Sequence, residues 1–170
     1  MIRVVLTGSE STGKTTLAHR LAEHYGAELV PEFVRDFAAK KGGAISFSDH
    51  GPIARGQMAL EDEHIARAAN LVVQDTDLLS TVVYCDHYFG RCPPWIAETA
   101  AQRRPDLYLL CEIDVPWEAD GVRDRGHIRE EMQQLFRDAV AVSGVHSVIL
   151  RGSIEDRFRA SIMAIDPLLD

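Results

Sequence analysis

An eight-residue segment near the start of the chain, Gly8 to Thr15, combines glycines, hydroxyl side chains and a lysine. It reads Gly-Ser-Glu-Ser-Thr-Gly-Lys-Thr and matches the pattern GxxxxGKS/T at every fixed position. Glycines let such a loop curl until its backbone N–H groups face an anion. The Lys14 ammonium can then reach β- and γ-phosphates, and the Thr15 hydroxyl can ligate Mg²⁺. We therefore predict a nucleotide site made by Gly8, Ser9, Glu10, Ser11, Thr12, Gly13, Lys14, Thr15 and Thr16.

Two weaker signals concern the rest of the nucleotide. No NKxD-like segment, which reads guanine in GTPases, occurs in the chain, so we expect ATP with Mg²⁺ as its metal ion. Near the end of the chain, Arg151-Gly152-Ser153 follows an apolar run. An adenine ring could lie against the backbone there, and we place Gly152 in the nucleotide site.

Two pairs of charged residues follow further apolar runs. Glu32 and Arg35 are three residues apart, so on a helix they share one face. Beside the phosphate loop, this carboxylate and guanidinium could handle a substrate hydroxyl and a transferring phosphoryl group. The alternative is an ordinary surface ion pair, worth a few tenths of a kcal/mol.

Asp75 and Asp77 flank Thr76 directly after another apolar run. Alternate residues of an extended segment point the same way, so both carboxylates could face one pocket. One could hold Mg²⁺ and one could accept a proton from a hydroxyl group. The alternative is that Asp77 caps the following helix. ATPases that activate water often place a carboxylate where Thr76 stands, so the sequence favours transfer to a bound acceptor.

The segment 114–129 carries three arginines, several acids and two glycines, which is typical of a mobile lid. Arg123 could neutralise charge on a transferring phosphoryl group, and Arg125 and Arg129 are weaker candidates. Asp120 and Trp117 could contact substrate. The alternative is a solvated loop with internal salt bridges.

Aromatic residues gather between 78 and 95, where they could stack on a flat ring of the acceptor or simply pack between helices. We place Tyr88 in the acceptor site; its aromatic and basic neighbours are Tyr84, Phe89, Arg91 and Trp95.

These candidates follow a regular alternation of short apolar runs and longer amphipathic segments. The pattern predicts five strands, at 2–7, 28–30, 71–74, 107–113 and 146–150. It predicts helices at 14–25, 32–40, from Ser48 to about Asn70, at 78–88, 95–103 and 129–142, and one capped by Ser153. Strands separated by helices indicate an α/β fold of three layers, a five-stranded parallel sheet with helices on both faces. Ligands of such sheets sit at the carboxyl ends of the strands.

Composition limits the function classes. The chain has 170 residues, which fits one domain over 1–170 with a lid at about 114–129. Its net charge of −8 argues against nucleic acid as a partner, and no apolar run is long enough to span a membrane. Three cysteines without CxxC spacing are typical of a reducing cytoplasm, where we expect the protein to act on small molecules. The oligomeric state stays open.

Four motifs in order give the chain a family resemblance: GSESTGKTTLA, PEFVRDF, DTDLLST and PWEADGVRDRG. The chain resembles the ribosylnicotinamide kinase domain of the NadR-type NAD-biosynthesis proteins. The resemblance implies a P-loop kinase fold and phosphoryl transfer from ATP to the 5′-hydroxyl of nicotinamide riboside, giving nicotinamide mononucleotide. It assigns Lys14 to phosphates, Thr15 to Mg²⁺, Asp75 or Glu32 to the base or metal-side carboxylate, and Arg123 to the lid.

The resemblance leaves alternatives open. The larger family members also carry an adenylyltransferase domain, for which this sequence has no room, so only the kinase step is implied. The acceptor could instead be another nucleoside, a nucleotide or a coenzyme precursor. A module that binds ATP to regulate a partner, without a kinase activity, is the alternative outside the enzymes.

Overall fold

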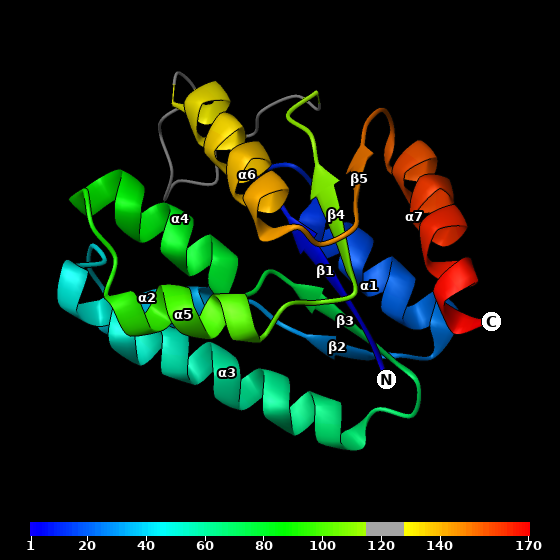
Figure 1. The fold of residues 1–170 in the computed structure, drawn as a ribbon, viewed down its shortest axis with the longest axis horizontal. Coiled ribbons are helices and arrows are strands. Elements are labelled where there is room, and N and C mark those ends of the chain that lie inside the picture. Colours follow the sequence, from blue (N-terminus) through cyan, green and yellow to red (C-terminus); the bar gives the residue numbers. More distant parts are fainter. Residues whose placement is uncertain (115–127) are drawn as a thin grey trace.

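A computed structural model describes residues 1–114 and 128–170 of the chain. Five parallel strands form one sheet in the order β2-β3-β1-β4-β5. The strands are β1 (Ile2–Thr7), β2 (Glu28–Val30), β3 (Leu71–Asp75), β4 (Leu107–Cys111) and β5 (Ser147–Leu150). Since all five run the same way, their carboxyl ends lie along one edge of the sheet (Figure 1).

Seven α-helices cover the sheet in the described part of the chain. They are α1 (Lys14–Tyr25), α2 (Phe33–Lys41), α3 (His50–Arg67), α4 (Leu78–Phe89), α5 (Pro94–Gln102), α6 (Arg129–Ser143) and α7 (Ile154–Leu169). Helices α1 and α7 pack on one face, and α3, α4 and α6 lie on the other, with α2 against α3 and α5 against α4 (Figure 1). The predicted three-layer α/β fold is therefore confirmed.

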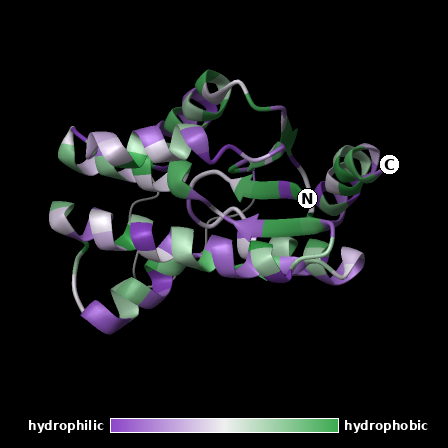
Figure 2. Cartoon of the chain, turned by 60° about the horizontal axis from the view of Figure 1, so that its bottom comes forward, coloured by the Kyte–Doolittle hydropathy of each residue, from purple (hydrophilic) through white to green (hydrophobic). Residues whose placement is uncertain are grey.

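The sheet is apolar because it is covered on both faces. Every residue of β3 and β4 is buried, and the strands are hydrophobic along most of their length (Figure 2). On β1, Val4 and Leu6 pack with α1 and α7, whereas Val5 between them packs with α6 and β4. Successive side chains of a strand point to opposite faces, so one strand supplies both cores.

The predicted elements agree closely with the observed ones, and most boundaries match within one residue; the two ends of α3 and the end of β4 differ by more. Helix α3 begins at His50, after a 3₁₀ turn (Phe47–Asp49), and not with a cap at Ser48. Ser46 and Asp49 form a reciprocal capping box that holds this turn. Strand β4 ends at Cys111, where its pairing with β5 ends at Leu150. The predicted cap of α7 by Ser153 is confirmed by its bond from the Asp156 N–H.

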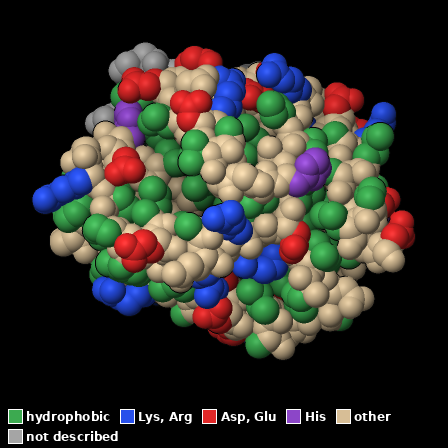
Figure 3. Space-filling model, in the orientation of Figure 1, with side chains coloured by type: hydrophobic (Ala, Val, Ile, Leu, Met, Phe, Trp, Pro, Cys, Tyr) green, Lys and Arg blue, Asp and Glu red, His purple; other side chains and the backbone are tan. Residues whose placement is uncertain are grey.

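Charges are mixed over the surface, as expected for an acidic chain that also carries 18 basic residues. On the face shown in Figure 3, basic and acidic side chains are interspersed, without a broad basic stripe. None of the described helices has the length and apolar character needed to cross a membrane. The three cysteines carry free thiols.

Candidate functional site

A pocket of about 190 Å³ opens at the carboxyl ends of β1 and β3. It lies where the loop after β1 meets the start of α2 and the start of α4. Its lining residues are Gly8, Ser11, Thr12, Gly13, Lys14, Thr15, Thr16, Glu32, Arg35, Thr76, Ser80 and Tyr84. The structure therefore brings most of the predicted phosphate loop, both members of the Glu32–Arg35 pair and the turn after β3 to one place.

The loop between β1 and α1 has the backbone shape that its glycines allow. Gly8 has a φ of +125°, and a Cβ there would lie 2.6 Å from the Cys111 carbonyl oxygen of β4. Gly13 has a φ of +79° and directly precedes α1. Because α1 begins at Lys14, its first backbone N–H groups and its positive dipole end lie at the pocket. This geometry suits an anion.

Lys14 lies along the inside of the loop. Its Nζ donates to the carbonyl oxygens of Gly8 at 3.0 Å and Ser9 at 2.6 Å. The Thr12 hydroxyl donates to the same Ser9 carbonyl at 3.0 Å. The ammonium is thus held at the mouth of the curled backbone, where it can meet a phosphate oxygen.

Asp75 and Thr15 meet beside this lysine. The Thr15 hydroxyl donates to Asp75 Oδ2 at 2.6 Å. Burial raises the pKa of the Asp75 carboxyl, the Thr15 hydrogen bond lowers it, and the negative charge of nearby Glu32 raises it. Among the described residues, no group of three His, Cys, Asp or Glu side chains could hold a metal by itself. One hydroxyl and one carboxylate do fit Mg²⁺, which keeps waters and takes its other ligands from substrate phosphates.

Glu32 and Arg35 form the second charged pair of the pocket. Arg35 Nε donates to Glu32 Oε2 at 2.6 Å, across one turn at the start of α2. The Glu32 side chain is 11% exposed and that of Arg35 is 55% exposed, so the carboxylate is held inside and the guanidinium reaches solvent. The negative charge of Glu32 is also one cause of the raised pKa of Asp75.

The expectation that Asp75 and Asp77 face one pocket is wrong. Thr76 has a φ of +77°, in the left-handed region, so the chain turns there and the alternation of an extended strand is lost. Asp77 is 6% exposed and caps α4 by accepting from the Leu79 N–H. Its other oxygen accepts from the Tyr108 hydroxyl at 2.6 Å. The capping alternative describes this residue. Neither aspartate is in the pocket lining, but Asp75 bonds Thr15, which is, whereas the Asp77 carboxylate accepts from Leu79 and Tyr108, which are not.

Tyr84, and not Tyr88, lines the pocket. The two rings stack with centroids 6.2 Å apart and planes 6° apart, one helical turn from each other on α4. Tyr88 is therefore a neighbour of the pocket wall, and its ring is half exposed. Spacing on a helix places both tyrosines on one side but does not say which is nearer the sheet edge.

The remaining predicted residues lie away from this pocket or outside the described residues. Gly152, after β5, donates its N–H to Asp114 Oδ2 at 2.6 Å. The lid predictions Trp117, Asp120 and Arg123 lie outside the described residues. Within the phosphate loop, Ser9 is buried beneath the cradle.

Helix α6 supports the loop through residues to which the sequence analysis assigned no such role. Gln133 is fully buried, accepts from the Ser9 N–H at 2.9 Å and donates to the Cys111 carbonyl at 3.1 Å. Arg129, considered only as a lid arginine, donates to the Ser11 carbonyl at 2.8 Å. A signal was available, because Gln133 shares the buried face of α6 with Phe136, and a polar residue on an apolar face must find a partner there.

Comparison with protein families agrees with this geometry. A family model described as an AAA domain matches residues 3–157 of the chain. The chain is similar to the trifunctional NAD biosynthesis/regulator protein NadR of Escherichia coli (strain K12), at 32% identity over 85% of this chain and 37% of that protein. It is also similar to NadR of Salmonella typhimurium, at 29% identity over 98% of this chain and 42% of that protein. The chain thus spans about two fifths of these curated relatives.

Solved structures of NadR proteins and of a kinase are also similar to this chain. The structure of a NadR protein in complex with NR matches this chain with a TM-score of 0.82 at 26% identity. The match covers 99% of this chain and 49% of the NadR chain. The structure of a NadR protein in complex with NAD and AMP-PNP matches with a TM-score of 0.81 at 25% identity. The match covers 98% of this chain and 49% of the NadR chain. A thymidylate kinase from Ehrlichia chaffeensis shares the fold, with a TM-score of 0.70 at 18% identity over 97% of this chain and 98% of its own.

Proposed function

The chain belongs to the AAA domain family of P-loop proteins, and from this starting point we propose that it is an ATP-dependent kinase of nicotinamide riboside. The γ-phosphoryl group of ATP passes to the 5′-hydroxyl of the riboside, and the products are nicotinamide mononucleotide and ADP. The similarity to NadR proteins, one of them in complex with NR and one with AMP-PNP, supports both substrates.

One observation carries this proposal. The pocket lining joins the phosphate loop with an inward-held Glu32, and it includes Thr15, whose hydroxyl donates to the buried Asp75. A site that only binds nucleotide needs the phosphate loop and the Thr15–Asp75 pair. A second carboxylate across the pocket from the loop supplies what a phosphoryl acceptor with a hydroxyl group also needs, a proton acceptor.

The nucleotide half of the site uses the loop amides and Lys14. Amides and the α1 N-terminus bind the β- and γ-phosphate oxygens, and the Lys14 ammonium neutralises charge that shifts toward the leaving group. We also propose Mg²⁺ as the metal; Thr15 and Asp75 would hold it, and it would supply charge neutralisation to the phosphates. Asp75 is buried and already fixed by Thr15, so it is positioned before the nucleotide arrives.

The acceptor half uses Glu32. Asp75 is engaged by Thr15, and Asp77 is sealed away on α4, which leaves Glu32 to take the hydroxyl proton. Arg35 donates to Glu32 Oε2 and so orients this carboxylate. The tyrosine pair headed by Tyr84 offers an apolar wall against which a flat acceptor ring can rest. We retain Arg123 as a proposed charge-neutralising residue above the phosphates.

The test is a phosphorylation assay with Mg-ATP and a panel of nucleosides, nucleotides and coenzyme precursors, followed by ADP release and identification of the phosphoester. Nicotinamide riboside should give acceptor-dependent ADP and nicotinamide mononucleotide. Lys14→Ala should remove turnover while the circular dichroism spectrum is retained, and Glu32→Gln should lower kcat by about 10²–10⁴-fold, as expected for a lost proton acceptor. Lys40→Ala on α2 is the matched control for a lysine outside the pocket.

Each result of the panel has a distinct meaning. Phosphorylation of another acceptor only would keep the kinase and replace its substrate. Slow ADP release that no acceptor accelerates would instead indicate a regulatory ATP-binding module. Near-normal turnover in Lys14→Ala would contradict the nucleotide site itself.

A further inference from the structure

A buried arginine, Arg157, lies beneath the phosphate loop on the second turn of α7. Its side chain is 2% exposed. It shares the buried face of α7 with Ser161 and Ile165, so a charge occupies a position where this amphipathic helix places small or apolar groups. Fully buried arginines are rare unless their donors are satisfied, which makes the partners of Arg157 informative.

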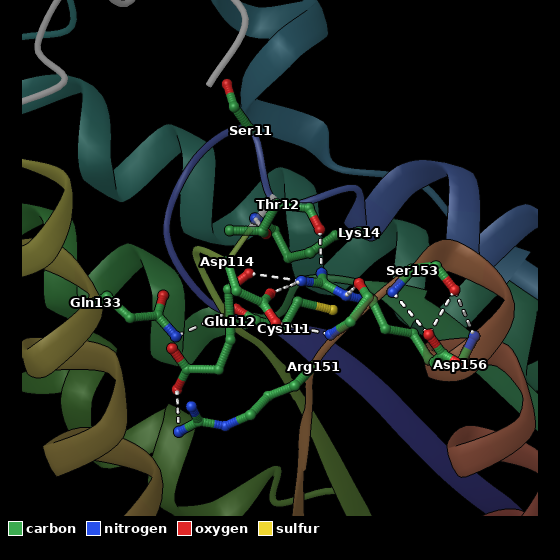
Figure 4. Close-up of polar contacts among 12 residues, drawn as sticks. Ser11, Thr12, Lys14, Cys111, Glu112, Asp114, Gln133, Arg151, Ser153 and Asp156 are labelled. Atoms are coloured by element: carbon green, nitrogen blue, oxygen red, sulfur yellow. Dashed lines mark hydrogen bonds and ion pairs between the residues drawn. The ribbon is translucent and has the colours of Figure 1, made fainter. Parts of the chain in front are cut away.

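The guanidinium joins segments that are far apart in the sequence. Its Nη1 donates to the Thr12 carbonyl of the phosphate loop at 2.6 Å. Its Nη2 donates to the Glu112 carbonyl beyond β4 at 2.9 Å, and its Nε donates to the Gly152 carbonyl beyond β5 at 3.1 Å. The Asp114 carboxylate pairs with Nη2 and also accepts from the Gly152 N–H. Figure 4 shows Thr12, Asp114 and Glu112 converging at this point below the loop.

The hydrogen bond from Arg157 to the Thr12 carbonyl fixes the direction of one amide in the phosphate loop. No cis peptide bond occurs in the described residues, so the Thr12 carbonyl and the Gly13 N–H point in opposite directions from one planar unit. With the carbonyl held beneath the loop by Arg157, the Gly13 N–H must point to the pocket side. Among the described residues, none accepts a hydrogen bond from that N–H. A charged donor on the carbonyl also polarises the same peptide and strengthens its N–H as a donor.

A second arginine acts on the neighbouring peptide. Arg129 of α6 donates to the Ser11 carbonyl, which by the same geometry directs the Thr12 N–H. Burial lowers the pKa of Arg129, the positive charge of Arg157 lowers it further, and the negative charge of Asp114 raises it. Arg129 and Arg157 therefore act on adjacent peptides of the loop, through the Ser11 and Thr12 carbonyls.

On these contacts we propose that Arg157 is a positioning residue of the nucleotide site, which orients the Gly13 amide toward a bound phosphate and ties the loop to the strand ends β4 and β5. The inference rests on the proposed nucleotide site and deepens it. Arg157 does not touch the phosphate itself. Its effect passes through the Thr12 peptide, so it should change the affinity for the nucleotide and not that for the acceptor.

The experiment compares Arg157→Lys and Arg157→Met by calorimetric titration with Mg–AMP-PNP. Lysine keeps the charge but gathers its donors on one nitrogen, so it cannot hold three carbonyls at once. We expect Arg157→Lys to weaken nucleotide binding about tenfold, equivalent to one lost hydrogen bond to a charged donor, and Arg157→Met to weaken it about a hundredfold. The KM for the acceptor should stay unchanged in Arg157→Lys.

Arg159→Met is the matched control, because Arg159 lies on the same helix with its side chain 71% exposed. It should bind the nucleotide as the wild type does. A purely structural role predicts a different result, since partial unfolding lowers the number of binding sites in the titration and leaves the Kd of the folded molecules unchanged. That result, a wild-type Kd in Arg157→Lys, or equal losses for nucleotide and acceptor would each overturn the proposal.

A measurement on the wild type guards against variants that do not fold. The Gly13 amide resonance should shift and its hydrogen exchange should slow when Mg–AMP-PNP is added, and absence of both changes would overturn the proposal. The titration also separates this inference from the kinase assignment. A protein that binds AMP-PNP but does not phosphorylate nicotinamide riboside loses the substrate proposal, while the Arg157 comparison still gives its answer.

Discussion

Two aspartates at the end of β3, Asp75 and Asp77, have different surroundings, although they are two residues apart. Asp75 is 4% exposed and Asp77 is 6% exposed, so burial does not distinguish them. Asp75 lies next to the pocket, where it accepts from the hydroxyl of Thr15, a residue of the pocket lining. Asp77 faces the opposite core, where it caps α4 and accepts from Tyr108. The difference arises at Thr76, whose left-handed backbone turns the chain between them.

The two environments differ in what surrounds the carboxylate. Around Asp75 are groups that a nucleotide can replace or join, namely Lys14 and the Thr15 hydroxyl. Around Asp77 are a fixed phenol, a helix N-terminus and the buried Glu61 of α3, whose pKa Asp77 raises. A carboxylate at a strand end therefore becomes functional when the chain leaves it facing replaceable partners, and structural when its partners are permanent.

Asp75→Asn should give the largest difference between the two sides. The amide removes the negative charge next to Thr15, so we expect kcat to fall about 10²–10³-fold, the range for losing one group that organises transition-state charge. Because burial raises the pKa of Asp75, the neutral amide should leave the free energy of unfolding unchanged or higher. Asp77→Asn is the matched control and should keep its activity. If both variants lost activity equally, the two sides would not differ as described.

Asp77→Ala should act on stability. It removes the α4 cap and the acceptor of the buried Tyr108 hydroxyl, so we expect the free energy of unfolding to fall by about 2–3 kcal/mol in urea denaturation. Turnover per folded molecule should stay near that of the wild type. Unchanged stability together with lost turnover would place Asp77 in the substrate site after all.

Glu61 should make the sealed side dependent on pH. Burial and the charge of Asp77 raise its pKa to about 7, although Arg103 Nη2 lies 3.0 Å from its carboxylate. The folded protein therefore binds this proton more tightly than the unfolded chain, and stability should fall as the pH rises from about 4.5 toward 7, by on the order of 1–3 kcal/mol. Glu61→Gln should make this slope shallower in urea denaturation at several pH values, while the part due to the raised pKa of Asp75 remains. Glu63→Gln, exposed on the same helix, should keep it.

Tyr108→Phe should have the smallest effect. Loss of the hydroxyl leaves Asp77 with its backbone donor, so the free energy of unfolding should fall by about 1 kcal/mol with no change in turnover. Tyr25→Phe is the control, because its hydroxyl donates to Asp166 at 2.7 Å on the exposed surface. A larger loss of unfolding free energy for Tyr25→Phe than for Tyr108→Phe would contradict the buried position of the Asp77–Tyr108 hydrogen bond.

Much of this site could be predicted from local sequence. The phosphate loop needs glycines, a lysine and a threonine at fixed spacing between a strand and a helix, and each of these is a local property. Glu32 and Arg35 were found in the same way, from helical spacing after a predicted strand. The α/β fold followed from the alternation of apolar runs and amphipathic segments, which the structure confirms element by element.

The predictions that differ from the structure concern the direction of a side chain, which its position in the sequence does not determine. Asp77 was placed in the pocket because an extended segment was assumed, and one residue at positive φ reversed its side chain. The prediction of Tyr88 in the acceptor site is not matched by the pocket lining, which contains Tyr84, because spacing on a helix does not show which turn reaches the strand ends. The role of Arg157 could not be predicted from the sequence, because three of its hydrogen-bond partners are backbone carbonyl oxygens, which no residue type identifies.

By itself, the sequence determined which chemistry this protein can hold, because residue type, spacing and periodicity decide that a loop binds phosphate and that strands alternate with helices. Only the tertiary structure decided which buried charges serve that chemistry. The reason is physical: a side chain acts through the atoms it faces, and those atoms come from segments brought together only by the fold, as Thr12, Glu112 and Gly152 are around Arg157.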